Sequence, residues 1–148
     1  MLSPSKWLGS CSLAVLVALY VVGAVSIPPG SLRHEVQTLP LWFPIVLGFQ
    51  ERDITKWMAL PLLIFWFAIM TLIWLFLLGW ARIVTGHFFP TEIAMTLVIG
   101  VACLTGLIAG LRWRTSTRPV VAFSVTVLVA LLQLIAFRVS LIPYIGQR

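Results

Sequence analysis

The chain has 148 residues, of which 61% are hydrophobic and only 9% charged, whereas soluble domains carry about 25% charged residues. Its two Cys, two His and four acidic residues are too few for a disulfide framework, a dense metal cluster or a set of many catalytic carboxylates. The formal charge of +6 comes from Lys and Arg placed beside apolar runs, which suits lipid headgroups better than nucleic acid. We therefore expect a small integral membrane protein that does not bind nucleic acid.

Four stretches are long and apolar enough to cross a bilayer. A helix rises about 1.5 Å per residue and the hydrocarbon core is about 30 Å thick, so one crossing needs about 20 apolar residues. We predict an all-α fold in which residues 1–148 form a single multi-pass membrane domain. It is an integral membrane bundle of four transmembrane helices, at about 7–27, 57–80, 91–111 and 119–142.

The first span also has features of a secretory signal peptide. Lys6 precedes its apolar core, and the small residues at 23–26 end it. Its apolar stretch is longer than the 7–15 residues or so that are usual for such a peptide. We expect the span to be retained, with cleavage as the alternative.

A fifth apolar run, at 39–49, is too short to cross by itself. Pro40, Pro44 and Gly48 interrupt regular helix hydrogen bonding in it. Because backbone exposed to lipid must satisfy its own hydrogen bonds, we expect a short interfacial segment, at the membrane surface or tucked against the bundle. Docking on a partner is a further possibility, but interfacial anchoring by Trp42 is the simpler interpretation.

Tryptophan favours the headgroup level at both faces of a bilayer. Trp57 and Trp80 lie at the two ends of the second span, about 34 Å of helix apart, which matches one bilayer with a slight tilt. We predict five interfacial anchors: Trp7, Trp42, Trp57, Trp80 and Trp113.

Four spans divide the basic residues unequally between the two faces. One face receives Arg33, Arg52, Lys56, Arg112, Arg114 and Arg118, and the other receives Lys6, Arg82, Arg138 and Arg148. The positive-inside rule then puts the first loop and the 112–118 loop in the cytoplasm and both termini outside. Lys6 argues for the opposite orientation because it directly precedes a span. The orientation and the host membrane stay open.

Small residues recur every four positions in two spans and permit close approach of helices in lipid. They are Ala102, Gly106 and Gly110 in the third span, and Ser10, Ala14 and Ala18 in the first. We expect these helix-packing residues to act within the chain more than in a dedicated dimer contact.

A polar cluster is predicted on one side of the membrane, consisting of Arg82, His87, Glu92, Gln133 and Arg138. A pair between Glu92 and Arg138 would lower the cost of holding each charge near hydrocarbon, and Gln133 could extend the network. A structural role is the stronger interpretation, because a carboxylate in a first helical turn is favoured by the helix dipole and Arg can extend to the headgroups.

Other site types have little support in the sequence. His34 and His87 are expected in loops at opposite faces, which disfavours haem ligation within the chain. Cys11 and Cys103 lack a CxxC motif and are expected to pack as small apolar residues. The sequence contains no phosphate loop, GxSxG or HExxH motif. We predict no catalytic residue, metal or cofactor.

The leading hypothesis is an accessory or scaffold subunit, leaning towards a non-enzyme, that acts through helix contacts with another membrane protein or a second copy of itself. The alternative is a small transporter or channel that uses Glu92, His87 and Arg138. A lipid-modifying or quinone-linked enzyme is a third possibility, for which the sequence offers no nucleophile.

Overall fold

The structure is a computed structural model that describes residues 2–26, 33–81 and 89–142. Within these ranges it is helical and contains no strand. Four long helices, α1 (Pro4–Ser26), α4 (Thr55–Leu77), α5 (Pro90–Arg112) and α6 (Pro119–Ser140), are long and apolar enough to cross a membrane. The predicted all-α bundle of four membrane-length helices is confirmed, as expected for a multi-pass integral membrane protein.

Proline and glycine set several helix boundaries. Pro90 and Pro119 occupy the first positions of α5 and α6, where a missing N–H costs nothing and the ring fixes a helical φ. Helix α4 ends three residues before Trp80, the predicted end of the second span. Its C-cap residue, Leu78, is followed by Gly79 with φ 77°, a backbone conformation that favours glycine and ends the helix. Pro61 lies inside α4. It cannot donate to the Trp57 carbonyl, which accepts the Thr126 hydroxyl at 3.3 Å instead.

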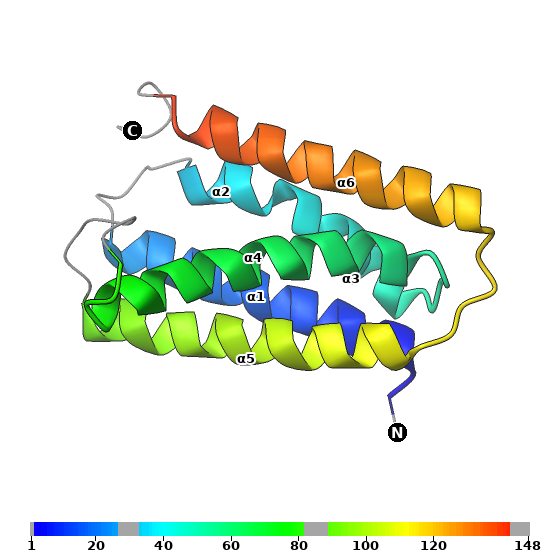
Figure 1. The fold of residues 1–148 in the computed structure, drawn as a ribbon, viewed down its shortest axis with the longest axis horizontal. Helices are drawn as coiled ribbons and strands as arrows, with labels where there is room; N and C mark the ends of the chain where they lie inside the picture. Colours follow the sequence, from blue (N-terminus) through cyan, green and yellow to red (C-terminus); the bar gives the residue numbers. More distant parts are fainter. Residues whose placement is uncertain (1, 27–32, 82–88, 143–148) are drawn as a thin grey trace.

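Three short elements form a segment that returns along α1. Helix α2 (Arg33–Thr38), the 3-10 helix η1 (Leu39–Leu41) and α3 (Trp42–Phe49) lie end to end beside α1 (Figure 1). Gly9 of α1 lies against Gly48, and Gly23 lies against His34. Gly9 and Gly23 are as far apart in the sequence as His34 and Gly48 are. Residues 33–49, here called the return segment, therefore run antiparallel to α1.

The return segment changes the expected topology. Residues 39–49 pack against the bundle, with Pro44, Ile45 and Gly48 buried. Of the two predicted placements, at the membrane surface or against the bundle, the second is the one observed. With α2 in front of it, however, the segment runs from one end of the bundle to the other. The predicted common face for Arg33 and Arg52 is wrong, because these residues lie at opposite ends of the return segment.

The start of α1 and the end of α6 consequently lie at opposite ends of the bundle (Figure 1). The expectation that both termini share a face assumed that residues 28–56 form a single loop on one side. That loop is instead interrupted by the return segment, so the chain runs back along α1 before α4 begins.

Helix α1 lies at the centre of the packing. It contacts α5, α3 and α4, while α6 lies along one edge and packs against α4 and α2. The core consists of fully buried aliphatic side chains such as Leu8, Val15, Leu62, Leu63 and Ile99. Burial of each such side chain is worth about 1.5–3 kcal/mol in water, but in lipid the gain comes from close packing.

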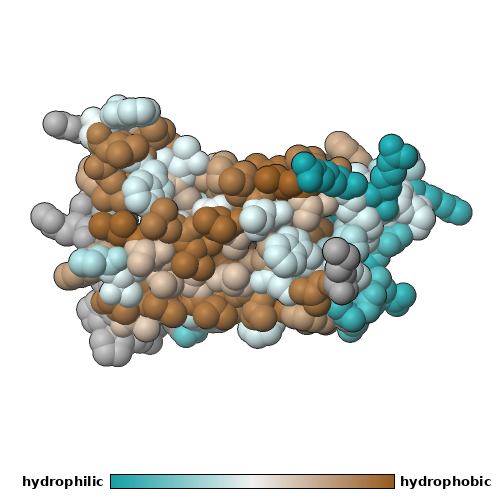
Figure 2. All heavy atoms as spheres, turned by 90° about the horizontal axis from the view of Figure 1, so that it is seen from below, coloured by the Kyte–Doolittle hydropathy of each residue, from teal (hydrophilic) through white to brown (hydrophobic). Residues whose placement is uncertain are grey.

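Hydrophilic side chains gather at the end of the bundle where α1 begins, and the lateral surface is mostly hydrophobic (Figure 2). We call this the charged end. Lys6 pairs with Glu51 at 2.6 Å, and Asp53 accepts the Ser116 hydroxyl at 2.6 Å. Six basic residues belong to it: Lys6, Arg52, Lys56, Arg112, Arg114 and Arg118.

These contacts affect the two acids at the charged end. The pKa of the Glu51 carboxyl is lowered by its hydrogen bond and charge interaction with Lys6. The pKa of the Asp53 carboxyl is lowered by hydrogen bonds from the hydroxyl and backbone N–H of Ser116. Both acids are therefore engaged in contacts within the chain.

Candidate functional site

The predicted polar cluster is only partly described by the structure. Arg82 and His87 lie outside the described residues. Glu92 is buried in the first turn of α5, where its Oε2 accepts the backbone N–H of Phe89 at 2.7 Å. This bond satisfies a donor that would otherwise lack a partner at the helix start, so the observed contact of Glu92 is a capping contact.

Glu92 and Arg138 do not form the predicted pair. Helices α5 and α6 occupy opposite edges of the bundle (Figure 1), and no ion pair joins these two residues in the described ranges. The Arg138 side chain is exposed at the end of α6, consistent with an Arg that extends towards the headgroup level.

Gln133 belongs to a different network, which ties α6 to α2. Its Nε2 donates to the Gln37 carbonyl at 3.3 Å. The Gln37 side chain donates to the Ser140 hydroxyl at 2.8 Å, and that hydroxyl donates to the Phe137 carbonyl at 2.6 Å. Gln37, Gln133 and Ser140 are all buried. Sequence reasoning missed Gln37 because it lies in a short polar segment, residues 30–38, outside the four predicted spans.

The Gln133 side chain also lines a hollow between α4 and α6. The hollow has a volume of about 430 Å³, and its walls include Trp57, Pro61, Phe65 and Ala130. Gln133 Oε1 is buried and accepts no hydrogen bond from the described residues. The orientation of the amide follows from its neighbour, since only the NH₂ group can donate to the Gln37 carbonyl.

The small residues of α5 face the interior of the bundle. Ala102, Gly106 and Gly110 are buried. A Cβ on Gly106 would lie 2.7 Å from Leu63 and 3.1 Å from Cys11, so this glycine contacts both α4 and α1. The glycine pair is therefore used for packing within the chain.

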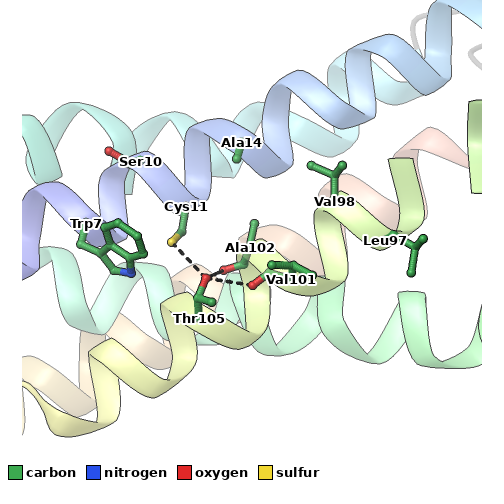
Figure 3. Close-up of a pocket in the computed structure, with 9 residues that line it drawn as sticks. All are labelled: Trp7, Ser10, Cys11, Ala14, Leu97, Val98, Val101, Ala102 and Thr105. Atoms are coloured by element: carbon green, nitrogen blue, oxygen red, sulfur yellow. Dashed lines mark hydrogen bonds between the residues drawn. The ribbon is translucent and has the colours of Figure 1, made fainter. Parts of the chain in front are cut away.

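The small residues of α1 divide between two surroundings. Ala18 is buried in the core, whereas Ser10 and Ala14 line a hollow of about 470 Å³ between α1 and α5 (Figure 3). Trp7 stands at one end of this hollow. Gly9 of α1 lies backbone to backbone against Gly48, a pair that sequence reasoning missed because the run at 39–49 was not aligned with α1.

The predicted tryptophan anchors lie at different levels. Trp7, Trp57 and Trp113 are near the charged end, where the Trp57 indole donates to Thr115 at 3.2 Å. Trp80 follows α4 at the opposite end and is exposed. Trp42 is also exposed but starts α3, midway along the return segment rather than at either end of the bundle.

The cysteines lie in the interior. Cys11 and Cys103 are both buried and free, and Cys11 Sγ is 3.8 Å from the Thr105 hydroxyl. His34 packs against Gly23. Among the described residues, no group of three potential metal ligands lies together.

No protein-family model matches the chain, and the comparisons with curated proteins and with solved structures also give no match.

Proposed function

We propose that the chain is a non-enzymatic accessory subunit that binds a transmembrane helix of another membrane protein along α6. The observation that carries the proposal is an apolar line of residues on α6 beside the α4–α6 hollow. We call it the α6 seam, and it consists of Phe123, Val127, Ala130 and Leu134. Its spacing of four, three and four residues is that of a helix-packing seam.

The α6 seam is available for a partner. Phe123 is 72% exposed and Leu134 is 50% exposed, and only Ala122, Val129, Gln133 and Ser140 of α6 are buried within the chain. Ala130, in the middle of the seam, is small enough for the backbone of a second helix to approach closely. The seam covers about 17 Å of helix, which suits a helix lying along it.

The neighbouring hollow supports the same proposal. A helix that follows the α6 seam would place its side chains over the hollow, which Ala130 and Leu134 of the seam help to line. The walls of this hollow are mainly apolar, including Leu60, Ile64 and Phe65, so apolar side chains of that helix could pack into it. The Gln37–Gln133–Ser140 network keeps α6 and the Gln133 amide in place.

Site-specific photocrosslinking tests the proposal. A benzophenone amino acid at Phe123 in the full chain is expected to give one adduct of defined mass in the native membrane. The matched control is Leu128, which is also exposed but lies on the other flank of α6. Ala130→Trp should remove the Phe123 adduct without changing detergent elution. Equal labelling from both positions, or a strictly monomeric product, would contradict the proposal.

The alternative of a transporter has less support in the described contacts. Glu92 is engaged with the Phe89 N–H, and Gln133 is engaged with Gln37. Each contact stabilises a helix start or a helix pair, so the polar groups have structural roles that need no transported ion.

A further inference from the structure

From the groove between α1 and α5 we infer a binding site for one anionic phospholipid, with an acyl chain in the groove and the phosphate at Arg112. The site lies on the side of the bundle opposite α6 and does not depend on the proposed partner. Two adjoining hollows form the groove. The inner hollow of about 470 Å³ and the outer hollow of about 540 Å³ share Trp7 as a lining residue.

The inner hollow suits a hydrocarbon chain. Leu97, Val98, Val101 and Ala102 line its α5 side, and the Val98 and Ala102 side chains point towards α1 (Figure 3). The Thr105 hydroxyl donates to the Val101 carbonyl at 2.8 Å and lies 3.8 Å from Cys11 Sγ. Because this hydroxyl is already bonded, it adds little attraction for a polar solute. An acyl chain can fill such a hollow without leaving a polar group unpaired.

The outer hollow lies at the charged end and carries the features of a headgroup site. Arg112 and Trp113 line it together with Leu2, Pro4 and Trp7. Within the described part of the chain, the Arg112 guanidinium has neither an ion pair nor a hydrogen bond. Arg binds phosphate oxygens through two parallel N–H groups, and indole rings favour the headgroup level.

The surrounding charges favour an anion. Of the two acids at the charged end, Glu51 is paired with Lys6 and Asp53 accepts hydrogen bonds from Ser116. Lys56 donates to the Trp113 carbonyl at 2.5 Å. Arg112 is therefore the cation of this hollow that remains available for a ligand, in a region where basic residues outnumber acids.

The length of the groove distinguishes a lipid from a partner helix. From Arg112 to Leu97, α5 rises about 22 Å, which extends from the headgroups past one leaflet of the hydrocarbon core, about 15 Å thick. A spanning helix would instead contact a surface that continues across both leaflets. A groove with a basic mouth and an apolar interior that ends at Leu97, before the far end of α5, matches a phospholipid with a negative headgroup.

The test uses the full chain in phosphatidylcholine vesicles that contain a minor fraction of phosphatidylglycerol with a photoreactive acyl chain. Labelled peptides are expected to come mainly from residues 97–105 of α5 and from α1. The same label on phosphatidylcholine should react about fivefold less, as expected for the loss of one favourable contact between Arg and an anionic lipid. Excess inorganic phosphate should not compete, since a free phosphate lacks the acyl chain.

Two variants separate the parts of the site. Arg112→Gln should abolish the roughly fivefold preference for phosphatidylglycerol over phosphatidylcholine. Labelling by phosphatidylcholine should persist in this variant. Arg118→Gln is the matched control, because Arg118 is exposed at the same end but does not line the groove. Ala14→Trp should reduce labelling by both lipids, because the ring would fill the inner hollow.

The inference would be overturned by equal labelling by the two lipids, by labels distributed evenly over α4, α5 and α6, or by a groove crosslink to another polypeptide. Competition by inorganic phosphate would show that the mouth binds the free ion and would overturn the assignment of a lipid. If Ala14→Trp fails to fold, the comparison of Arg112→Gln with Arg118→Gln still decides the outcome.

Discussion

Gly9 and Gly48 meet backbone to backbone where α1 crosses α3. A Cβ built on Gly48 would lie 2.8 Å from the Gly9 Cα and 2.9 Å from the Ser5 carbonyl oxygen. These are backbone atoms, which cannot rotate away as the tip of a side chain can. The contact therefore fixes how closely the return segment lies against α1.

Gly48→Ala is expected to destabilise the protein by about 1–3 kcal/mol, because the added methyl group forces two packed backbones apart. Gly100→Ala is the matched control, since a Cβ there meets nothing within 4 Å. It should raise stability by about 0.5–1 kcal/mol through the helix preference of Ala. Unfolding in dodecylmaltoside micelles titrated with SDS measures both changes. A neutral Gly48→Ala would show that the two helices are further apart than described.

The return segment predicts a specific topology. Cysteines placed at Leu2 and Arg114 should react with an impermeant maleimide from the same face of the membrane, and a cysteine at Phe89 should react from the opposite face. All three positions are exposed, and native Cys11 and Cys103 are buried. Four spans without the return segment would instead place Leu2 on the face of Phe89.

The same arrangement gathers six basic residues at the end where α1 begins, including Lys6. The positive-inside rule then assigns this end to the cytoplasm, so Leu2 and Arg114 should be labelled in inverted vesicles. Labelling of both in right-side-out vesicles would keep the topology and reverse the orientation.

Glu92 is expected to stabilise the folded protein through its bond to the Phe89 N–H. Glu92→Ala should cost about 1 kcal/mol, the usual value for loss of a helix-capping bond, because the Phe89 N–H loses its acceptor. Glu92→Gln should cost less, since its amide oxygen can still accept that bond. Proton or cation flux across reconstituted vesicles should be the same for wild type, Glu92→Gln and Arg138→Leu. Flux that is lost in both variants would favour the transporter alternative.

The Asp53 contact predicts a local response to acid. Its pKa is lowered in the folded chain, mainly by the Ser116 hydroxyl. The resulting stabilisation is fully present above the ordinary Asp pKa of about 3.9 and is lost as the pH falls through the lower folded value. Ser116→Ala should raise the pKa of Asp53 and leave that of Glu51 unchanged, as followed by carboxyl NMR shifts. An unchanged Asp53 pKa would show that the Ser116 hydroxyl is not its main partner.

The long helices could be predicted because a bilayer imposes one length and an apolar composition on each crossing. The path of residues 33–49 could not, because Pro40 and Pro44 interrupt the pattern and Arg33, His34 and Glu35 resemble a polar loop. Its placement depends on the contact of Gly48 with Gly9, a pairing of distant residues that composition and periodicity do not reveal.

The contacts of the predicted polar cluster also depend on pairings of residues that are distant in the sequence, and they were harder to predict for that reason. The pair of Glu92 and Arg138 was expected because consecutive helices were assumed to be neighbours. In the structure α4 packs with both α5 and α6, while these two helices occupy separate edges. The partner of Gln133 is instead the Gln37 carbonyl, which comes from the segment whose path was not predicted.

The broken form of the return segment also bears on biogenesis. A stretch this short, with polar residues at its start, falls below what the insertion machinery accepts as an independent span. The segment packs against α1, α4 and α6, so we expect it to enter the bilayer as the second arm of a hairpin whose first arm is α1. The pairing of α1 with residues 33–49 would then set the side of the membrane on which each later loop emerges.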